Sequence, residues 1–159
     1  MKNPKPVRLN SLRLSGFLPY RLSVLANTVS SAIAGAYAQR FGLSIPAWRV
    51  LAVLADTPNL SAAEVAAQTA MDKVAVSRAV AALLRDKRLQ RRIARSDRRR
   101  SVLCLSSAGE RVYSQVVPVA LNYEKELLAS LDSADRDTLD RLLRVLLARA
   151  EELGTLHAS

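Results

Sequence analysis

Apolar residues recur at the spacing of an α-helix along most of the chain. Six of them mark one face of a long segment that starts near Phe17 and ends at Phe41: Leu18, Leu22, Leu25, Val29, Ile33 and Ala36. Residues three or four positions apart lie on one side of a helix, so this segment predicts an amphipathic helix, with Gly42 where helices commonly end. Ser44, followed by Pro46, predicts a second helix of about ten residues.

The clearest helix start in the sequence is the stretch Ser61-Ala62-Ala63-Glu64, which is a capping box. Leu60 and Val65 stand on either side of its first turn, at the two positions of a hydrophobic staple. We therefore predict a short third helix that ends near residue 69. Asp72 predicts the cap of a fourth helix, which runs to about residue 87.

This fourth helix has one apolar face and one small and basic face. At 100° per residue, Val76, Leu83 and Leu84 fall within about 60° of Val80. Four residues point the opposite way: Ala75, Arg78, Ala82 and Arg85. We expect the Val80 side to be buried and the Arg78 side to face solvent or a partner.

The pattern changes between residues 89 and 105 to two short extended runs, 89–95 and 102–105, around a charged tip, which predicts a β-hairpin. A second capping box at Ser107, or a cap at Ser106, begins a long helix to about Leu131. Asp132 predicts the cap of a last helix, to about Leu153. Leu and Ala are abundant while Gly (5) and Pro (6) are scarce. The sequence therefore predicts a mostly α (α+β) fold with about six helices and one hairpin.

The charge of the chain is concentrated in one region. The net charge is +10, and residues 85–100 carry nine positive and two negative side chains. Residues 124–153 instead carry eight acidic and five basic side chains. A polyanion is therefore the expected partner, and the segment 85–100 is expected to face it.

Two short capped helices joined by a tight turn and followed by a hairpin form a winged helix-turn-helix. Three motifs strengthen this interpretation: Asp72-Lys73-x-x-Val76-Ser77-Arg78-x-Val80, Leu89-x-Arg91-Arg92, and Asp97-Arg98-Arg99-Arg100-Ser101-Val102-x-Cys104-Leu105-Ser106-x-x-Gly109. They resemble the recognition-helix and wing signature of MarR/SlyA-type bacterial transcription regulators, and the resemblance extends from Phe17 to Leu153. One departure is Arg88, because the family has a glycine after the recognition helix. We expect a winged helix-turn-helix over 44–105 and a helical dimerisation domain formed by 1–43 and 106–159.

We expect two groups of residues to contact DNA. Those on the fourth helix are Lys73, Val74, Ala75, Ser77, Arg78 and Arg85. Those in the wing are Arg91, Arg92, Arg95, Asp97, Arg98, Arg99 and Arg100. Arg78 can reach the acceptors of a guanine, and Val74 is small enough to approach a thymine methyl group. The alternative for Lys73 or Arg85 taken singly is a solvated side chain.

Asp97 would repel DNA, so we expect it to fix the shape of the wing tip through an ion pair or turn hydrogen bonds. The resemblance pairs Asp97 with Arg99. The other wing arginines are expected to neutralise phosphates, and an arginine at the tip can enter the minor groove.

The first helix and the last two are too apolar to face solvent, which favours a homodimer over an intramolecular bundle. A two-fold dimer would present two copies of the winged helix-turn-helix, 44–105, to a pseudo-palindromic operator. We call this part of the chain the reading head. The resemblance implies an obligate dimer and a small-molecule effector. The candidate ligand-binding residues are Tyr20, Arg21, Trp48 and Arg49, which suit an aromatic carboxylate. The alternative is that Trp48 belongs to the core and Arg21 is solvated.

Nothing in the sequence predicts an enzyme, a cofactor or a metal site, since His157 is the single histidine and no Gly-rich phosphate loop occurs. Cys104, the single cysteine, is predicted to be a buried structural thiol. The first 36 residues imitate a signal peptide, but Arg21 and Asn27 interrupt the apolar stretch, and no membrane span is expected. We expect a bacterial cytoplasmic protein that associates with the nucleoid when bound to DNA.

These observations predict a sequence-specific DNA-binding regulator, a repressor released from its operator by an aromatic acid. One alternative is a ligand-independent architectural or nucleoid-type DNA binder, which the charge of the wing would also suit. A second is an RNA-binding or ribosome-associated protein that uses the same basic hairpin.

Overall fold

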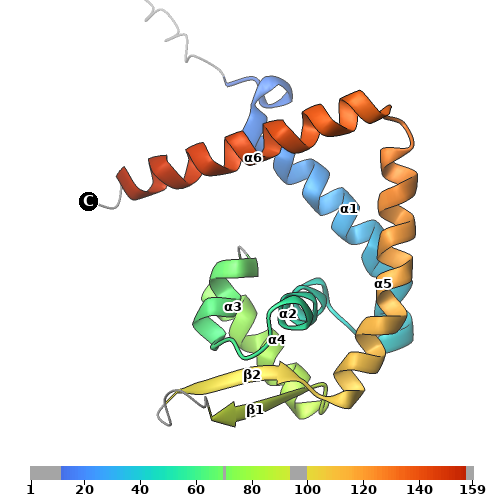
Figure 1. Cartoon of the computed structure of the whole chain (residues 1–159), viewed down its shortest axis with the longest axis vertical. Helices are drawn as coiled ribbons and strands as arrows, with labels where there is room; N and C mark the ends of the chain where they lie inside the picture. The colour runs from blue at the N-terminus through green and yellow to red at the C-terminus, as the bar shows by residue number, and fades with distance from the viewer. Residues whose placement is uncertain (1–11, 70, 94–99, 157–159) are drawn as a thin grey trace, which may run out of the picture. The chain divides into compact units, whose positions relative to one another are not determined.

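The computed structural model describes residues 12–69, 71–93 and 100–156. After a short 3₁₀ turn, η1 (Leu14–Gly16), the elements are α1 (Leu18–Phe41), α2 (Ile45–Asp56), α3 (Ala62–Thr69), α4 (Lys73–Arg85), β1 (Leu89–Ile93), β2 (Ser101–Leu105), α5 (Ser107–Leu128) and α6 (Ser133–Leu156) (Figure 1). In the described part of the chain, the predicted order of six helices with one hairpin after the fourth is confirmed.

Contacts within the chain divide it into two compact units, Met1–Val117 and Pro118–Ser159. Pro118 lies inside α5, and a proline at a helix interior removes one backbone hydrogen bond. The first unit holds α1 to β2 and the start of α5, so it contains every element of the predicted reading head.

The N-termini of the helices are held by the residues that the sequence predicted. Ser61 Oγ accepts from Glu64 N at 3.3 Å, and Glu64 Oε2 accepts from Ser61 N at 2.7 Å, which completes the capping box of α3. Asp132 Oδ1 accepts from Asp135 N at 2.8 Å at the start of α6. For α5, Ser106 Oγ accepts from Gly109 N at 3.1 Å, so Ser106 is the cap and Ser107 is the first helical residue.

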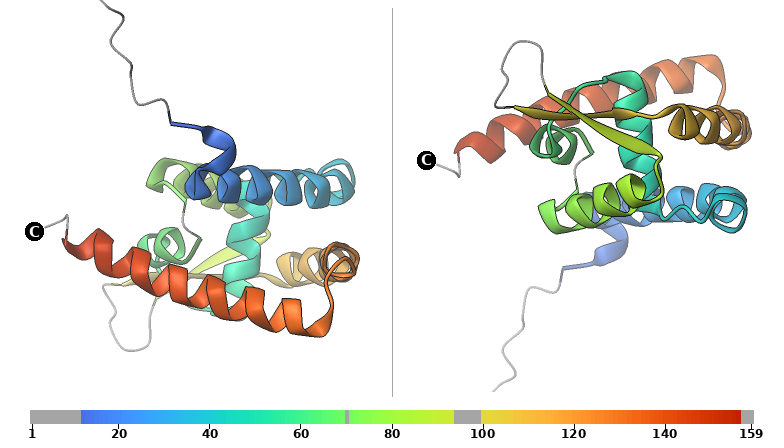
Figure 2. Two further views of the ribbon diagram at one scale, coloured as in Figure 1. Left: turned by 90° about the horizontal axis from the view of Figure 1, so that it is seen from above. Right: turned by 90° about the horizontal axis from the view of Figure 1, so that it is seen from below.

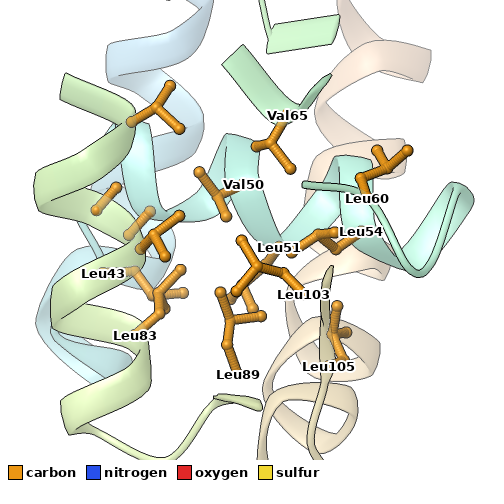
Figure 3. Packing of buried hydrophobic residues seen from close by; sticks show 14 of the residues in the cluster. Leu43, Val50, Leu51, Leu54, Leu60, Val65, Leu83, Leu89, Leu103 and Leu105 are labelled. Carbon is orange, nitrogen blue, oxygen red and sulfur yellow. The ribbon is translucent and has the colours of Figure 1, made fainter. Parts of the chain in front are cut away.

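The core of the first unit is built around α2. Val50 and Leu51 are fully inaccessible, and α2 packs against α1, α3, α4 and β2. Figure 3 shows Val50, Leu51 and Leu54 of α2 in one cluster with Leu83 of α4 and Leu103 of β2. The predicted buried face of α4 is confirmed, because Val76 and Val80 are buried. The reading head thus shares one apolar core.

The hairpin is fixed to the rest of the head by its second strand. β1 and β2 are antiparallel, with Leu89 opposite Leu105 and Arg91 opposite Leu103. β1 follows α4, and β2 leads into α5 (Figure 2, right). The backbone of Leu103 also bonds the loop after α2: Leu103 N donates to Leu60 O at 2.8 Å, and Asn59 N donates to Leu103 O at 3.0 Å. The loop therefore acts as a third, very short strand beside the hairpin.

The turn between α4 and β1 packs closely against the start of α5. Lys87, with φ 54°, takes the left-handed conformation, so Arg88 does not require the glycine that the family resemblance led us to expect at that position. Ser106 N donates to Arg88 O at 3.0 Å, and Ser106 Oγ donates to Lys87 O at 2.6 Å. Two hydrogen bonds from one serine thus join this turn to α5.

Three helices expose several large apolar side chains; on α5 these are Val119, Leu121 and Leu127. On α1 these include Leu18, Tyr20, Leu22, Val24 and Leu25. On α6 they are Leu139, Leu142, Leu143, Val145, Leu146, Leu147 and Leu153. Within the described residues, no helix is long and apolar enough to cross a membrane. Exposed apolar surface of this extent is typical of an interaction surface.

Gly109→Ala is expected to lower the free energy of unfolding by about 1–3 kcal/mol, the usual cost of overpacking. A Cβ at this position would lie 2.1 Å from Arg88 O, a backbone atom that Ser106 N already holds. Thermal or urea unfolding monitored by circular dichroism measures the change.

Gly35→Ala is the matched control, because no atom lies within 4 Å of its added Cβ and alanine favours a helix interior. We expect this variant to be at least as stable as the wild type. Equal stability of the two variants would contradict the close packing at Gly109.

Candidate nucleic-acid interface

The cap and the core of the first unit fix the orientation of α4. Asp72 Oδ1 accepts from Val74 N at 3.0 Å and from Ala75 N at 2.9 Å, which holds the first turn. The buried face of α4 packs against α2 and α3. Because one face is committed to the core, the opposite face is presented to the surroundings without freedom to rotate.

Three of the residues predicted to contact DNA, Ala75, Arg78 and Arg85, lie on this opposite face, and the others are accessible beside it or at the start of the helix. Lys73, Val74, Ser77, Arg78 and Arg85 are exposed, and Ala75 is half-buried. Val74 is 57% exposed, although it is apolar. Arg85 Nε donates to Asp86 Oδ1 at 3.2 Å, whereas Arg78 makes no hydrogen bond or ion pair within the described residues. Arg78 is therefore available to an external acceptor.

A depression of about 290 Å³ beside Arg78 connects α4 with the N-terminus of α2. Its walls are Ser44, Pro46, Ala75, Arg78, Ala79 and Ala82. The N-terminal end of a helix carries a partial positive charge and favours anions. Sequence analysis did not place α2 at this surface, since the proximity results from the packing of α2 against α4.

The wing residues fall into three groups. Arg91 and Arg92 are exposed on β1. Arg95, Asp97, Arg98 and Arg99 lie outside the described residues. Arg100 is described, and its side chain is hydrogen-bonded to Glu64.

Arg100 Nη2 donates to Glu64 Oε2, the same oxygen that accepts from Ser61 N. The Arg100 hydrogen bond, and to a lesser degree those with Ser61, lower the pKa of Glu64 to about 2. Glu64 therefore remains ionised at neutral and mildly acidic pH. Sequence analysis assigned Glu64 only to the capping box, because nothing local in the sequence connects residues 36 positions apart.

Arg88, the position that departs from the family signature, has a specific contact. Arg88 Nη2 donates to Phe41 O at 2.5 Å, at the C-terminal end of α1. The carbonyl groups at a helix C-terminus are unpaired within the helix and carry a partial negative charge, so a guanidinium suits this end. The α4–β1 turn is thereby tied to α1.

Trp48 and Arg49, predicted to bind a ligand, lie in an aromatic cluster. The Trp48 ring is 5.7 Å from that of Tyr37 and 5.6 Å from that of Tyr113. Arg49 Nη2 donates to Ser30 Oγ at 3.1 Å. Burial raises the pKa of Tyr37, although the charge of Arg49 opposes this shift. A cavity of only about 90 Å³ adjoins Trp48 and Arg49.

Tyr20 and Arg21 line a different depression, of about 370 Å³, formed by α1 alone. The structure therefore places the four candidate ligand-binding residues on two separate cavities. A third cavity, of about 480 Å³, was not predicted. Its lining includes Arg92, Glu110 and Tyr113.

Cys104 is buried, and its Sγ lies 3.8 Å from Gln90 O across the hairpin. Its burial was predicted from the flanking leucines. Across residues 12–69, 71–93 and 100–156, no cluster of three histidine, cysteine or acidic side chains could hold a metal ion.

Comparison with known proteins places this geometry in a family. Residues 41–100, from the end of α1 into the wing, match the model of the MarR family. The HTH-type transcriptional regulator BilQ of Clostridium symbiosum (strain WAL-14163) is 27% identical over 108 residues, which cover 68% of this chain and 75% of that protein.

Solved structures agree over nearly the whole chain. A MarR/EmrR family transcriptional regulator from Acinetobacter sp. ADP1 is 27% identical with a TM-score of 0.81, over 89% of this chain and 99% of that chain. The DNA binding of BpsR of Bordetella bronchiseptica is regulated by 6-hydroxynicotinic acid. BpsR is 22% identical with a TM-score of 0.73, over 86% of this chain and 97% of that chain. Residues 41–100 of the chain thus match the MarR family of DNA-binding transcriptional regulators, and the fold is the winged helix-turn-helix fold of these regulators.

Proposed function

We propose that the protein is a homodimeric repressor that reads a pseudo-palindromic operator and is released from it by a small aromatic acid. The observation that carries the proposal is Arg78, exposed and without a partner in the described chain, on a helix whose orientation is fixed. An arginine in this position can donate two hydrogen bonds to O6 and N7 of a guanine in the major groove.

The neighbours of Arg78 on α4 have complementary roles in the proposal. Val74 contacts a thymine methyl group, and Ala75 allows close approach to the bases. Lys73, Ser77 and Arg85 bind phosphates, as do Arg91 and Arg92 on β1. Arg95, Arg98 and Arg99 would extend this set, with Asp97 shaping the tip. Phosphate contacts fix the position of the head, while Arg78 and Val74 supply its base preference.

The homodimer is supported by the apolar faces of α1 and α6, each of which exposes several large side chains. In the proposal, residues 1–43 and 106–159 form the dimerisation domain, and 44–105 form the reading head. The two-fold axis would place two α4 helices about one DNA turn apart. The protein would act in the bacterial cytoplasm, on nucleoid DNA.

The proposed effector is an aromatic carboxylate bound beside Trp48 and Arg49, and the α1 depression lined by Tyr20 and Arg21 is the second candidate position. BpsR, a structural relative, responds to an aromatic acid of this class. Pockets for drug-sized ligands enclose about 300–1,000 Å³. The 90 Å³ beside Trp48 is too small, so ligand binding there requires the cluster to open. The ligand then lowers operator affinity only if it binds the open state more tightly.

Arg78→Ala is expected to cost about 1–3 kcal/mol per head and to relax base preference at one position of each half-site. Selection of bound duplexes from a randomised library, followed by sequencing, measures this preference. Lys73→Ala is the control, since loss of a phosphate contact weakens binding to all sequences alike. An unchanged sequence motif for Arg78→Ala would refute the assignment of α4 as the reading helix, and no motif for the wild type would favour an architectural DNA binder.

Arg99→Ala is expected to weaken binding and to reduce the slope of log K against log salt by about one per head. The reason is the loss of one neutralised phosphate, with the selected motif retained. Fluorescence anisotropy of a labelled duplex across a salt series gives the slope. Tighter binding to structured RNA than to this duplex would favour the RNA-binding alternative.

Substituted benzoic and nicotinic acids are expected to raise the melting temperature of the protein and to release it from DNA. Stabilisation follows from binding to the folded state, about 2.7 kcal/mol at a hundredfold excess over Kd. Arg49→Gln should abolish the shift in melting temperature if the ligand binds beside Trp48, and Arg21→Gln should abolish it if the ligand binds in the α1 depression, because each removes the guanidinium that can pair with the carboxylate there. If Arg92→Gln were the only variant to lose the ligand-induced rise in melting temperature, the ligand would bind in the 480 Å³ cavity instead.

A further inference from the structure

Glu64 serves two parts of the reading head at once. Its carboxylate completes the capping box of α3 and also accepts a hydrogen bond from Arg100, which directly precedes β2. Both side chains are about half exposed, at 42% for Arg100 and 43% for Glu64. The pair therefore lies at the surface of the head, where a DNA phosphate could compete for the guanidinium.

The backbone brings these two side chains together before they pair. Leu103 is held to Asn59 and Leu60 by two hydrogen bonds, and Glu64 follows four residues after Leu60. Arg100 lies three residues before Leu103, directly before the first residue of β2. An isolated surface ion pair is weak because ordering two long side chains costs entropy. Here the loop that the pair closes is already short, so less entropy remains to be lost.

We infer that Arg100 is a positioning residue that braces the wing against α3, and that it is not one of the phosphate contacts. The brace and the Leu103 hydrogen bonds hold β2 at two points, which fixes the direction in which the hairpin leaves the head. Glu64 neutralises Arg100, so the pair adds no net charge toward DNA. This inference rests on the proposed DNA-binding function and narrows the set of wing arginines that serve it.

The test compares Glu64→Gln, Arg100→Gln and the double variant with the wild type. The amide oxygen of the glutamine that replaces Glu64 can still accept from Ser61 N, so the capping box is kept. The double variant has the same net charge as the wild type, because one positive and one negative group are lost together. Arg91→Gln is the matched control for a true phosphate contact, since Arg91 is exposed on β1 without a partner in the described chain.

The first readout needs no DNA. Amide hydrogen exchange over residues 101–105 should be about two- to fivefold faster in each single variant than in the wild type. The double variant should exchange no faster than the single variants, because all three lack the same ion pair. Unchanged exchange in every variant would overturn the brace. This readout decides the inference even if the wild type fails to show sequence preference, which would instead count against the proposed function.

The second readout is the salt dependence of binding to a random-sequence duplex of about three helical turns. The double variant should bind about two- to fivefold more weakly at fixed salt, with the slope of the wild type. Arg91→Gln should reduce the slope by about one per head. A reduction of the same size in the double variant would show that Arg100 neutralises a phosphate, and would overturn the inference.

Discussion

The architecture of the reading head depends on the burial of α2. Val50 and Leu51 are fully inaccessible, and α2 packs against α1, α3, α4 and β2. Each of these neighbours therefore buries one face in the same apolar core. The direction in which its opposite face points is determined by that burial. Arg78 on α4 faces outward for this reason: Val76 and Val80, on the other side of that helix, are buried in this core.

Polar interactions in the reading head define the ends of its helices and the register of its hairpin, which the apolar core does not define. Apolar packing fixes a face of a helix or strand, but it defines the ends of these elements poorly. Ser61, Asp72 and Ser106 fix the starts of three helices, and the hydrogen bonds of Leu103 fix the register of the hairpin against the loop after α2. The second strand of the hairpin, β2, is thus anchored both by its buried side chains and by its backbone.

Much of this fold could be predicted, because its signals are local. The capping box at Ser61 and the Val80 face of α4 lie within a few turns of sequence, where helix periodicity is informative. The contacts of Glu64 with Arg100 and of Arg88 with Phe41 could not be predicted, since they join residues 36 and 47 positions apart. The separation of Tyr20 from Trp48 could not be predicted either, because the packing of the helices determines which cavity a side chain lines. Arg88, where the family has a glycine, is accommodated because the turn places its left-handed residue at Lys87, one position earlier.

The close approach of Gly109 to Arg88 O has a mechanical consequence for the reading head. With no side chain between them, and with Ser106 bonded to both Lys87 and Arg88, the first turn of α5 and the end of α4 move as a single piece. Arg88 in turn is bonded to the end of α1. These contacts couple the first turn of α5 to the helix that carries Arg78. A rotation of that turn is therefore expected to turn α4 with it.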